Sequence, residues 1–344
     1  PLNAQDSALP ATLFHITVEN TAAKSVRTSV IGWLQNAVCN AYAREYDALR
    51  KTKYYKKRGY ALCLHGAAAL PRARKRRNTE PARPDIVFAD FEEQDYGEWQ
   101  VQGTAFGAGP ASSDSPKQSQ VTGYQGTGFA SSSREGDEAQ GALISPPFII
   151  SRRHINFLIS GGNHPGLVYI QLEVDGKAVR TSHARNSDAM EWRSWAVDAW
   201  EGREARIIIV DRMSFLWGRI AVDHIEFSDT PRAQDAPIAE APDYGTMALA
   251  CAEPADFSAA LSGPLPPGRV PEEFLADDTG DYTTRDTRLG LLRTRDVALA
   301  PGEKHTFTFV LAWHFPNQFN GDVFAVTPWN VAHGAVGHFY ASRF

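Results

Sequence analysis

Residues 167–180 read LVYIQLEVDGKAVR, and they alternate apolar and polar side chains. The apolar side chains that share one face are those of Val168, Ile170, Leu172 and Val174. A period of two is typical of a strand with one face in a core. Asp175–Gly176 follows the last of them, and this dipeptide favours a two-residue hairpin turn. The segment therefore predicts an antiparallel hairpin.

Similar short apolar runs occur on both sides of this hairpin, separated by Gly, Ser and Pro. They include HINFLIS (154–160), EARIIIVD (204–211) and RIAVDHIEFSD (219–229). Seven or more short strands between residues 85 and 229 indicate a β-sandwich, because two sheets must cover each other's apolar faces.

The segments that flank residues 85–229 lack any such period. Residues 71–84 are rich in Pro and Arg, and residues 230–245 are rich in Pro and Ala, so both are predicted to be linkers. For the basic stretch Lys56–Arg77, a nucleic-acid or heparin patch is the alternative to a solvated linker.

Strand patterns occur again outside the two linkers. Residues 13–20 and 26–34 alternate and are expected to pair as a hairpin, and residues 305–314 are expected to share a sheet or sandwich with them. We therefore predict an all-β protein in which a sandwich is inserted into a discontinuous host β-domain, residues 1–70 and 246–344, because surface loops tolerate insertions.

Composition excludes several classes of protein. With 43% hydrophobic residues and a net charge of -5, the 344-residue chain is globular and is not expected to bind nucleic acid. No apolar run approaches the ~18 residues of a transmembrane helix. Its three cysteines, an odd number without C-x-x-C spacing, make no closed disulfide framework, and a single disulfide pair is the open alternative. The chain begins without Met or a signal peptide and is expected to be part of a longer polypeptide.

Two stretches resemble a known family. They are ALPATLFHITVENTAAKSVRTSVIGWLQNAV and VALAPGEKHTFTFVLAWHFPN, the latter followed by FYASRF. Through them, residues 1–36 and 295–344 resemble the N-terminal β-domain of glycoside hydrolase family 116, which includes bacterial relatives of the non-lysosomal glucosylceramidase. The resemblance implies that the two catalytic carboxylates belong to an (α/α)6 domain beyond this chain. That downstream domain is then the expected partner.

The inserted segment resembles a second family. DFEEQDYGEWQVQGTAFG, GALISPPFII, HINFLISGGNHPG, EVDGKAVR and WGRIAVDHIEFSD occur in the order found in a module of levanase-like and other secreted bacterial glycosidases. This resemblance implies a jelly-roll, galactose-binding-like or carbohydrate-binding fold that associates with sugar polymers. It also implies a secreted or periplasmic protein.

The candidate sugar-binding residues lie in and near the loop SGGNHPG (160–166). Glycines allow close approach of a ligand, and Asn163 and His164 offer donors and acceptors to hydroxyl groups. Trp217 could present a flat face to a sugar ring, with Asp211 and Arg219 nearby in the sequence. The alternatives are a structural turn and a tryptophan that caps the core.

Acidic residues occur near both ends of the module. They are Asp90, Glu92, Asp95, Asp223 and Glu226. Because the first and last strands of a jelly roll pair, Asp90, Glu92 and Asp223 could bind Ca²⁺, which takes six to eight oxygen ligands. Solvated carboxylates at a sheet edge are the alternative. The histidines show no zinc spacing.

These features favour the non-catalytic β part of a family 116-like glycoside hydrolase, with a carbohydrate ligand for the insert. A retaining glycosidase needs two carboxyl groups about 5 Å apart, and the sequence offers no such pair, so the chain alone is expected to hydrolyse no glycoside. The alternative is an assembly module that mediates contacts in a homo-oligomer and binds no sugar.

Overall fold

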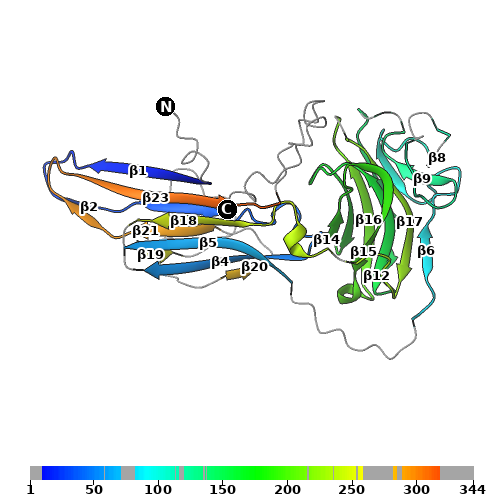
Figure 1. The fold of residues 1–344 in the computed structure, drawn as a ribbon. Coiled ribbons are helices and arrows are strands. Elements are labelled where there is room, and N and C mark those ends of the chain that lie inside the picture. The colour runs from blue at the N-terminus through cyan, green and yellow to red at the C-terminus, as the bar shows by residue number, and fades with distance from the viewer. Residues whose placement is uncertain are drawn as a thin grey trace. The chain divides into compact units, whose positions relative to one another are not determined.

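The computed structural model describes residues 10–57, 59–70, 82–112, 114–115, 120–134, 136, 138–214, 217–234, 236–252, 255–258, 282–284 and 289–317. The chain forms two compact units, residues 1–70 with 237–344 (unit 1) and residues 71–236 (unit 2). Both consist of antiparallel sheets, and the described residues contain no α-helix, so the all-β prediction is confirmed (Figure 1).

Unit 2 contains two six-stranded sheets. The first has the order β14 (Lys177–Ser182), β13 (Val168–Val174), β16 (Glu204–Asp211), β10 (Gly141–Ile144) and β7 (Gln100–Gly103), with β11 (Phe148–Ile149) on β16. The second has the order β15 (Ser187–Ala196), β12 (His154–Gly161), β17 (Ile220–Ser228), β9 (Gly128–Ser131) and β8 (Ala111–Ser112), with β6 (Ile86–Ala89) on β17.

The hairpin predicted at residues 167–180 is present as β13 and β14. Val174 pairs with Lys177, and Asp175 and Gly176 form the turn with φ values of 50° and 71°. Positive φ at both central residues is what a type I′ turn requires, and this turn matches the twist of the two strands.

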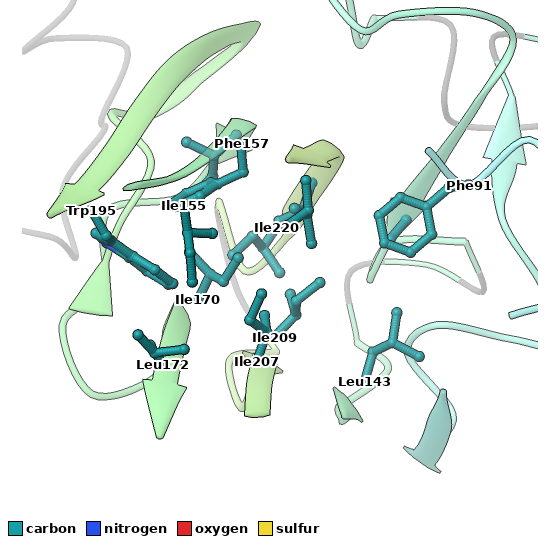
Figure 2. Close-up of a cluster of buried hydrophobic side chains, with 14 of the residues drawn as sticks. Phe91, Leu143, Ile155, Phe157, Ile170, Leu172, Trp195, Ile207, Ile209 and Ile220 are labelled. Atoms are coloured by element: carbon teal, nitrogen blue, oxygen red, sulfur yellow. The ribbon is translucent and has the colours of Figure 1, made fainter. Parts of the chain in front are cut away.

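The core of unit 2 lies between its two sheets. Figure 2 shows Ile155 and Phe157 of β12 close to Ile170 of β13 and Ile207 of β16, and each of these side chains is at most 1% exposed. Burying one such side chain contributes about 1.5–3 kcal/mol. Along β13, where buried and partly exposed residues alternate, this period decides which face becomes core, whereas β12 and β17 are buried along nearly their whole length.

Two arginine–carboxylate contacts, which we call the clasps, fasten the ends of unit 2. The Arg83 guanidinium donates to both carboxylate oxygens of Asp229, at 2.8 and 2.7 Å, and it holds the pKa of Asp229 well below its usual range. Arg232 donates to both carboxylate oxygens of Glu226, at 2.7 and 3.0 Å. Since β6 also pairs with β17, the first and last strands of unit 2 lie side by side.

The segment 230–245, which was expected to be a linker, is packed at both ends. The backbone N–H groups of Arg232 and Ala233 donate to the Ser194 hydroxyl of β15 in unit 2. Further on, Ala241 is fully buried in unit 1 in a cluster with Val38 and Tyr42. These contacts could not be predicted from the Pro and Ala content of the segment, because backbone groups and small side chains make most of them.

Unit 1 has a large sheet covered on one face by a smaller one. The large sheet has the order β1 (Ala11–Glu19), β23 (Lys304–His314), β18 (Thr246–Cys251), β5 (Tyr60–Ala69), β4 (Ala48–Lys57) and β20 (Tyr282–Thr284). The smaller sheet has the order β19 (Ala255–Ser258), β21 (Leu289–Thr294) and β3 (Ile31–Gln35), and β2 (Val26–Thr28) pairs with β22 (Val297–Leu299). Phe307, Phe309, Leu249 and Leu292 form the core between them.

The hairpin expected between residues 13–20 and 26–34 is not formed. β1 pairs with β23 along its whole length, while β2 pairs with β22 and β3 pairs with β21. The chain instead crosses to other sheets after β1, at a turn where the Asn20 side-chain amide donates to the carbonyls of Lys24 and Leu299.

Much of the basic stretch Lys56–Arg77 is also not a linker. β4 and β5 form a ten-residue antiparallel pairing that ends at Lys57 and Tyr60. Alternation along β5 buries Cys63 and His65, which anchor the strand in the core. Residues 71–81, and with them most of the first predicted linker, lie outside the described residues.

Close packing of the two sheets of unit 1 depends on Gly290 in β21. A Cβ atom at this position would lie 2.2 Å from Cys63 Sγ and 2.8 Å from His65 Cε1. The His65 ring cannot turn away freely, because its two nitrogens contact Thr52 Oγ1 and the Leu34 carbonyl oxygen, each at 2.9 Å. Burial also lowers the pKa of His65 to about 4, so the ring is neutral at pH 7.

We therefore predict that Gly290→Ala destabilises unit 1 by about 1–3 kcal/mol, the usual cost of overpacking a filled core. Gly66→Ala in β5 is the matched control, because no atom lies within 4 Å of a Cβ placed there. Urea unfolding followed by fluorescence measures both variants. Equal stability of the two would show that β21 moves away at little cost.

Candidate binding site at one end of unit 2

Three loops meet at one end of unit 2. They are residues 162–167 between β12 and β13, residues 183–186 between β14 and β15, and the described residues of 212–219 between β16 and β17, which are 212–214 and 217–219. The backbone N–H of Asn163 donates to Asn186 Oδ1 at 2.8 Å, which joins the first loop to the second. The backbone N–H of Gly162 donates to the Arg219 carbonyl oxygen at 2.8 Å, which joins the first loop to the third.

Trp217 and Arg219 form the aromatic and cationic part of this end. The Arg219 guanidinium lies 4.7 Å from the centroid of the Trp217 ring and donates to Asp188 Oδ1 at 2.6 Å. Both side chains are partly exposed. One face of the indole is therefore occupied by a guanidinium group that also has a carboxylate partner.

The backbone at Trp217 has an unusual conformation. Its φ is 59°, in the left-handed region that bulky residues rarely adopt. Gly162 packs so closely against it that a Cβ there would lie 1.9 Å from the Trp217 carbonyl oxygen. Such a conformation persists only where surrounding contacts fix it, and here the loop 162–167 supplies them.

Two of the predicted sugar-binding residues are buried. Asp211 is 0% exposed, and its carboxylate accepts hydrogen bonds from Ser132 Oγ at 2.6 Å and from the Met213 backbone N–H at 3.0 Å. His164 is 4% exposed. The structure thus places Asn163, Trp217 and Arg219 at the surface of this end and places Asp211 and His164 beneath it.

Asn186 and Asp188 belong to this end and were not predicted from the sequence. They follow β14, about 25 residues from the loop 162–167, and the structure brings them together through Asn163 and Arg219. The segment RNSD, residues 185–188, consists largely of residues that favour turns, and this was the feature of the sequence that could have indicated a loop here.

The acidic residues expected at a cation site only partly converge. Glu92 accepts hydrogen bonds from the backbone N–H groups of Thr127 and Gly128, at 2.8 and 2.9 Å. Asp223 accepts one from the Gln125 N–H at 2.7 Å, so both carboxylates hold the same turn, 125–128. Glu226 does not join them, because Arg232 and Asn156 bind its carboxylate.

Asp223 lies in an unfavourable environment for a negative charge. It is 0% exposed, and its Oδ1 atom has no hydrogen-bond partner among the described residues. Burial, together with the charges of Glu92 and Asp90, raises the pKa of Asp223 to about 7, whereas hydrogen bonds from Gly128 and Thr127 lower the pKa of Glu92. In the part of the chain that the structure describes, no three His, Cys, Asp or Glu side chains form a ready-made metal site.

No family model matches the chain. A candidate glycosyl hydrolase of Aspergillus rugulosus, ecdE, is 38% identical to it over 180 residues. The match takes in 52% of this chain and 24% of the relative, so the chain spans only a quarter of that protein.

Solved structures with similar folds are much more distant in sequence. The K3 adhesin domain of Lys-gingipain from Porphyromonas gingivalis is 11% identical, and the match covers 42% of this chain and 98% of that one, with a TM-score of 0.28. The CBM51 module of a Clostridium perfringens GH95 protein, solved with methyl-galactose, is 8% identical, and the match covers 42% and 99%, with a TM-score of 0.22.

Among the described residues, the structure contains no helix of the length and apolar character needed to cross a membrane.

The burial of Asp211 predicts a structural role. Asp211→Ala leaves the Ser132 hydroxyl and the Met213 N–H without their acceptor, so we expect a loss of about 2–4 kcal/mol in the free energy of unfolding. Asp198→Ala, at an exposed position of unit 2, serves as the control and should change stability by less than about 0.5 kcal/mol. Thermal unfolding measures both, and an unchanged midpoint for Asp211→Ala would contradict the assignment.

Proposed function

We propose that this chain is the non-catalytic β part of a glycoside hydrolase and that unit 2 binds carbohydrate at its loop end. The observation that carries the proposal is the 38% identity over 180 residues to the candidate glycosyl hydrolase ecdE. The resemblance of residues 1–36 and 295–344 to family 116 supports the finer assignment, a β-glucosidase or glucosylceramidase type with a downstream (α/α)6 domain. The resemblance of the insert supports a secreted or periplasmic protein.

The carboxylates of unit 2 favour a non-catalytic role. Asp223 and Glu92 have pKa values shifted in opposite directions, as the acid and the nucleophile of a glycosidase do. Asp223, however, is 0% exposed, and a general acid must come within hydrogen-bond reach of the glycosidic oxygen. This pair therefore serves the fold.

Unit 1 has a surface suited to contact with another domain. Leu13, Phe14 and Ile16 of β1 are 59%, 45% and 39% exposed. β1 is an edge strand of its sheet, so its outer backbone groups are also free of a neighbouring strand among the described residues. We propose that the catalytic domain of the parent polypeptide packs against this edge. The alternative is that a second copy of the chain packs there in a homo-oligomer.

Sugar binding by the loop end is tested with the 344-residue chain and the variant Asn163→Ala. Titration calorimetry against β-glucan, xylan and fructan oligosaccharides should detect binding, and the variant should bind about 5- to 30-fold more weakly, the scale of a lost hydrogen bond of about 1–2 kcal/mol. Its unfolding midpoint should stay near that of the unchanged chain.

Gln102→Ala is the control for this experiment, because Gln102 is an exposed polar residue on the edge strand β7. It should bind sugar normally. If no saccharide gives heat, and light scattering shows a dimer, the assembly function replaces sugar binding.

We further propose that Asp223 and Glu92 hold a Ca²⁺ ion at the turn 125–128, with Asp90 nearby. The orphaned Oδ1 atom of buried Asp223 fits an oxygen-seeking cation, because such an ion supplies the positive charge that the site lacks. Main-chain oxygens and water complete its usual set of six to eight ligands. The ion would fasten β17 to the turn 125–128.

Calcium should therefore raise the stability of the chain after treatment with EDTA. At ~2 mM Ca²⁺, a site of the affinity usual for extracellular modules contributes about 1–2 kcal/mol. Asp223→Asn should remove this response, whereas Asp198→Asn should keep it. Scanning calorimetry with and without Ca²⁺ gives the comparison, and an identical midpoint in both conditions for the unchanged chain would refute the site.

A further inference from the structure

The loop end of unit 2 is positively charged, although the chain as a whole is negatively charged. The described residues of loops 162–167, 183–186 and 212–219 include three arginines, Arg185, Arg212 and Arg219, and the start of β15 adds one carboxylate, Asp188. Three positive charges minus one leave +2 at this end of unit 2, whereas the whole chain carries -5. Asp211, the last residue of β16, is turned inward and is 0% exposed.

These charges lie on segments that contact one another. The backbone N–H of Arg212 donates to the Leu167 carbonyl oxygen at 2.9 Å, which ties the third loop to the first. Arg185 directly precedes Asn186, whose side chain binds the Asn163 backbone N–H. Arg212 thus contacts the loop 162–167 through its backbone, and Arg185 is the sequence neighbour of a residue that contacts the same loop.

The three arginines differ in their partners. Arg219 is held between the Trp217 ring and Asp188, so its charge is already matched. Arg185 and Arg212 are exposed, and neither has an ion-pair partner among the described residues. A guanidinium group presents a planar set of donors that matches a carboxylate or sulfate group, whereas a neutral sugar gains little from its charge.

We infer that the saccharide bound at these loops is anionic and carries carboxylate or sulfate groups that Arg185 and Arg212 recognise. The inference rests on the proposed sugar-binding function and narrows its ligand class. Trp217 and Asn163 contact the sugar ring, and the two arginines select its charge.

The test compares ligands that differ only in charge, using the 344-residue chain. Oligogalacturonate is compared with its methyl ester, and sulfated galactan oligosaccharides are compared with their unsulfated counterparts. The anionic member of a pair should bind about tenfold or more tightly at low ionic strength, since one charge-assisted contact contributes about 1.5 kcal/mol or more. This advantage should shrink in ~0.5 M NaCl.

Variants then identify the groups responsible. Arg212→Gln and Arg185→Gln should each weaken binding of the anionic ligand about 3- to 10-fold and leave binding of its neutral counterpart unchanged. Arg206→Gln, at an exposed position of β16, is the matched control and should bind both ligands normally.

The outcomes separate the two proposals. If the neutral member of each pair binds as well as the anionic one, the charge selection is wrong and sugar binding stands. An equal loss in Arg206→Gln would show non-specific attraction and would also refute the inference. If no neutral or anionic saccharide binds, the proposed function itself fails.

Discussion

Every large sheet in this protein has an apolar face that another sheet of the same unit must cover. In unit 2 two six-stranded sheets cover each other and bury residues such as Phe157 and Ile207 fully. In unit 1 a three-stranded sheet covers a six-stranded one. The side chains that stay partly exposed in unit 1 include Phe14 and Ile16 of the edge strand β1.

The sequence predicted those elements of the fold that are specified by residues close together in the chain. The β13–β14 hairpin followed from a period of two and an Asp-Gly turn that are contiguous in the chain. The pairing of β1 could not be predicted in the same way, because Phe14 lies opposite Phe309, almost 300 residues away. Both expected partners had the same alternating pattern. The structure instead pairs β3 with β21 of the smaller sheet, and Gly32 of β3 packs closely against Phe309 and Leu249 of the large sheet.

The candidate site was predictable to a similar degree. Glycines and polar residues marked the loop that contains Asn163, and proximity in sequence linked Trp217 to Arg219. The same proximity suggested Asp211, because position along a strand does not reveal that its carboxylate is buried and turns inward to Ser132. Asn186 and Asp188 join the site through contacts between loops, and such contacts have no signature in a single sequence.

The position of the clasps along β17 has a consequence for how unit 2 works. This strand begins at Ile220, next to the loop that contains Trp217 and Arg219, and ends at Ser228, next to the clasped Asp229. Nine residues of strand extend about 30 Å. The loops that contain Trp217 and Arg219 therefore lie one full strand length from the clasps, so a substitution at one end of β17 does not reach the contacts that hold its other end.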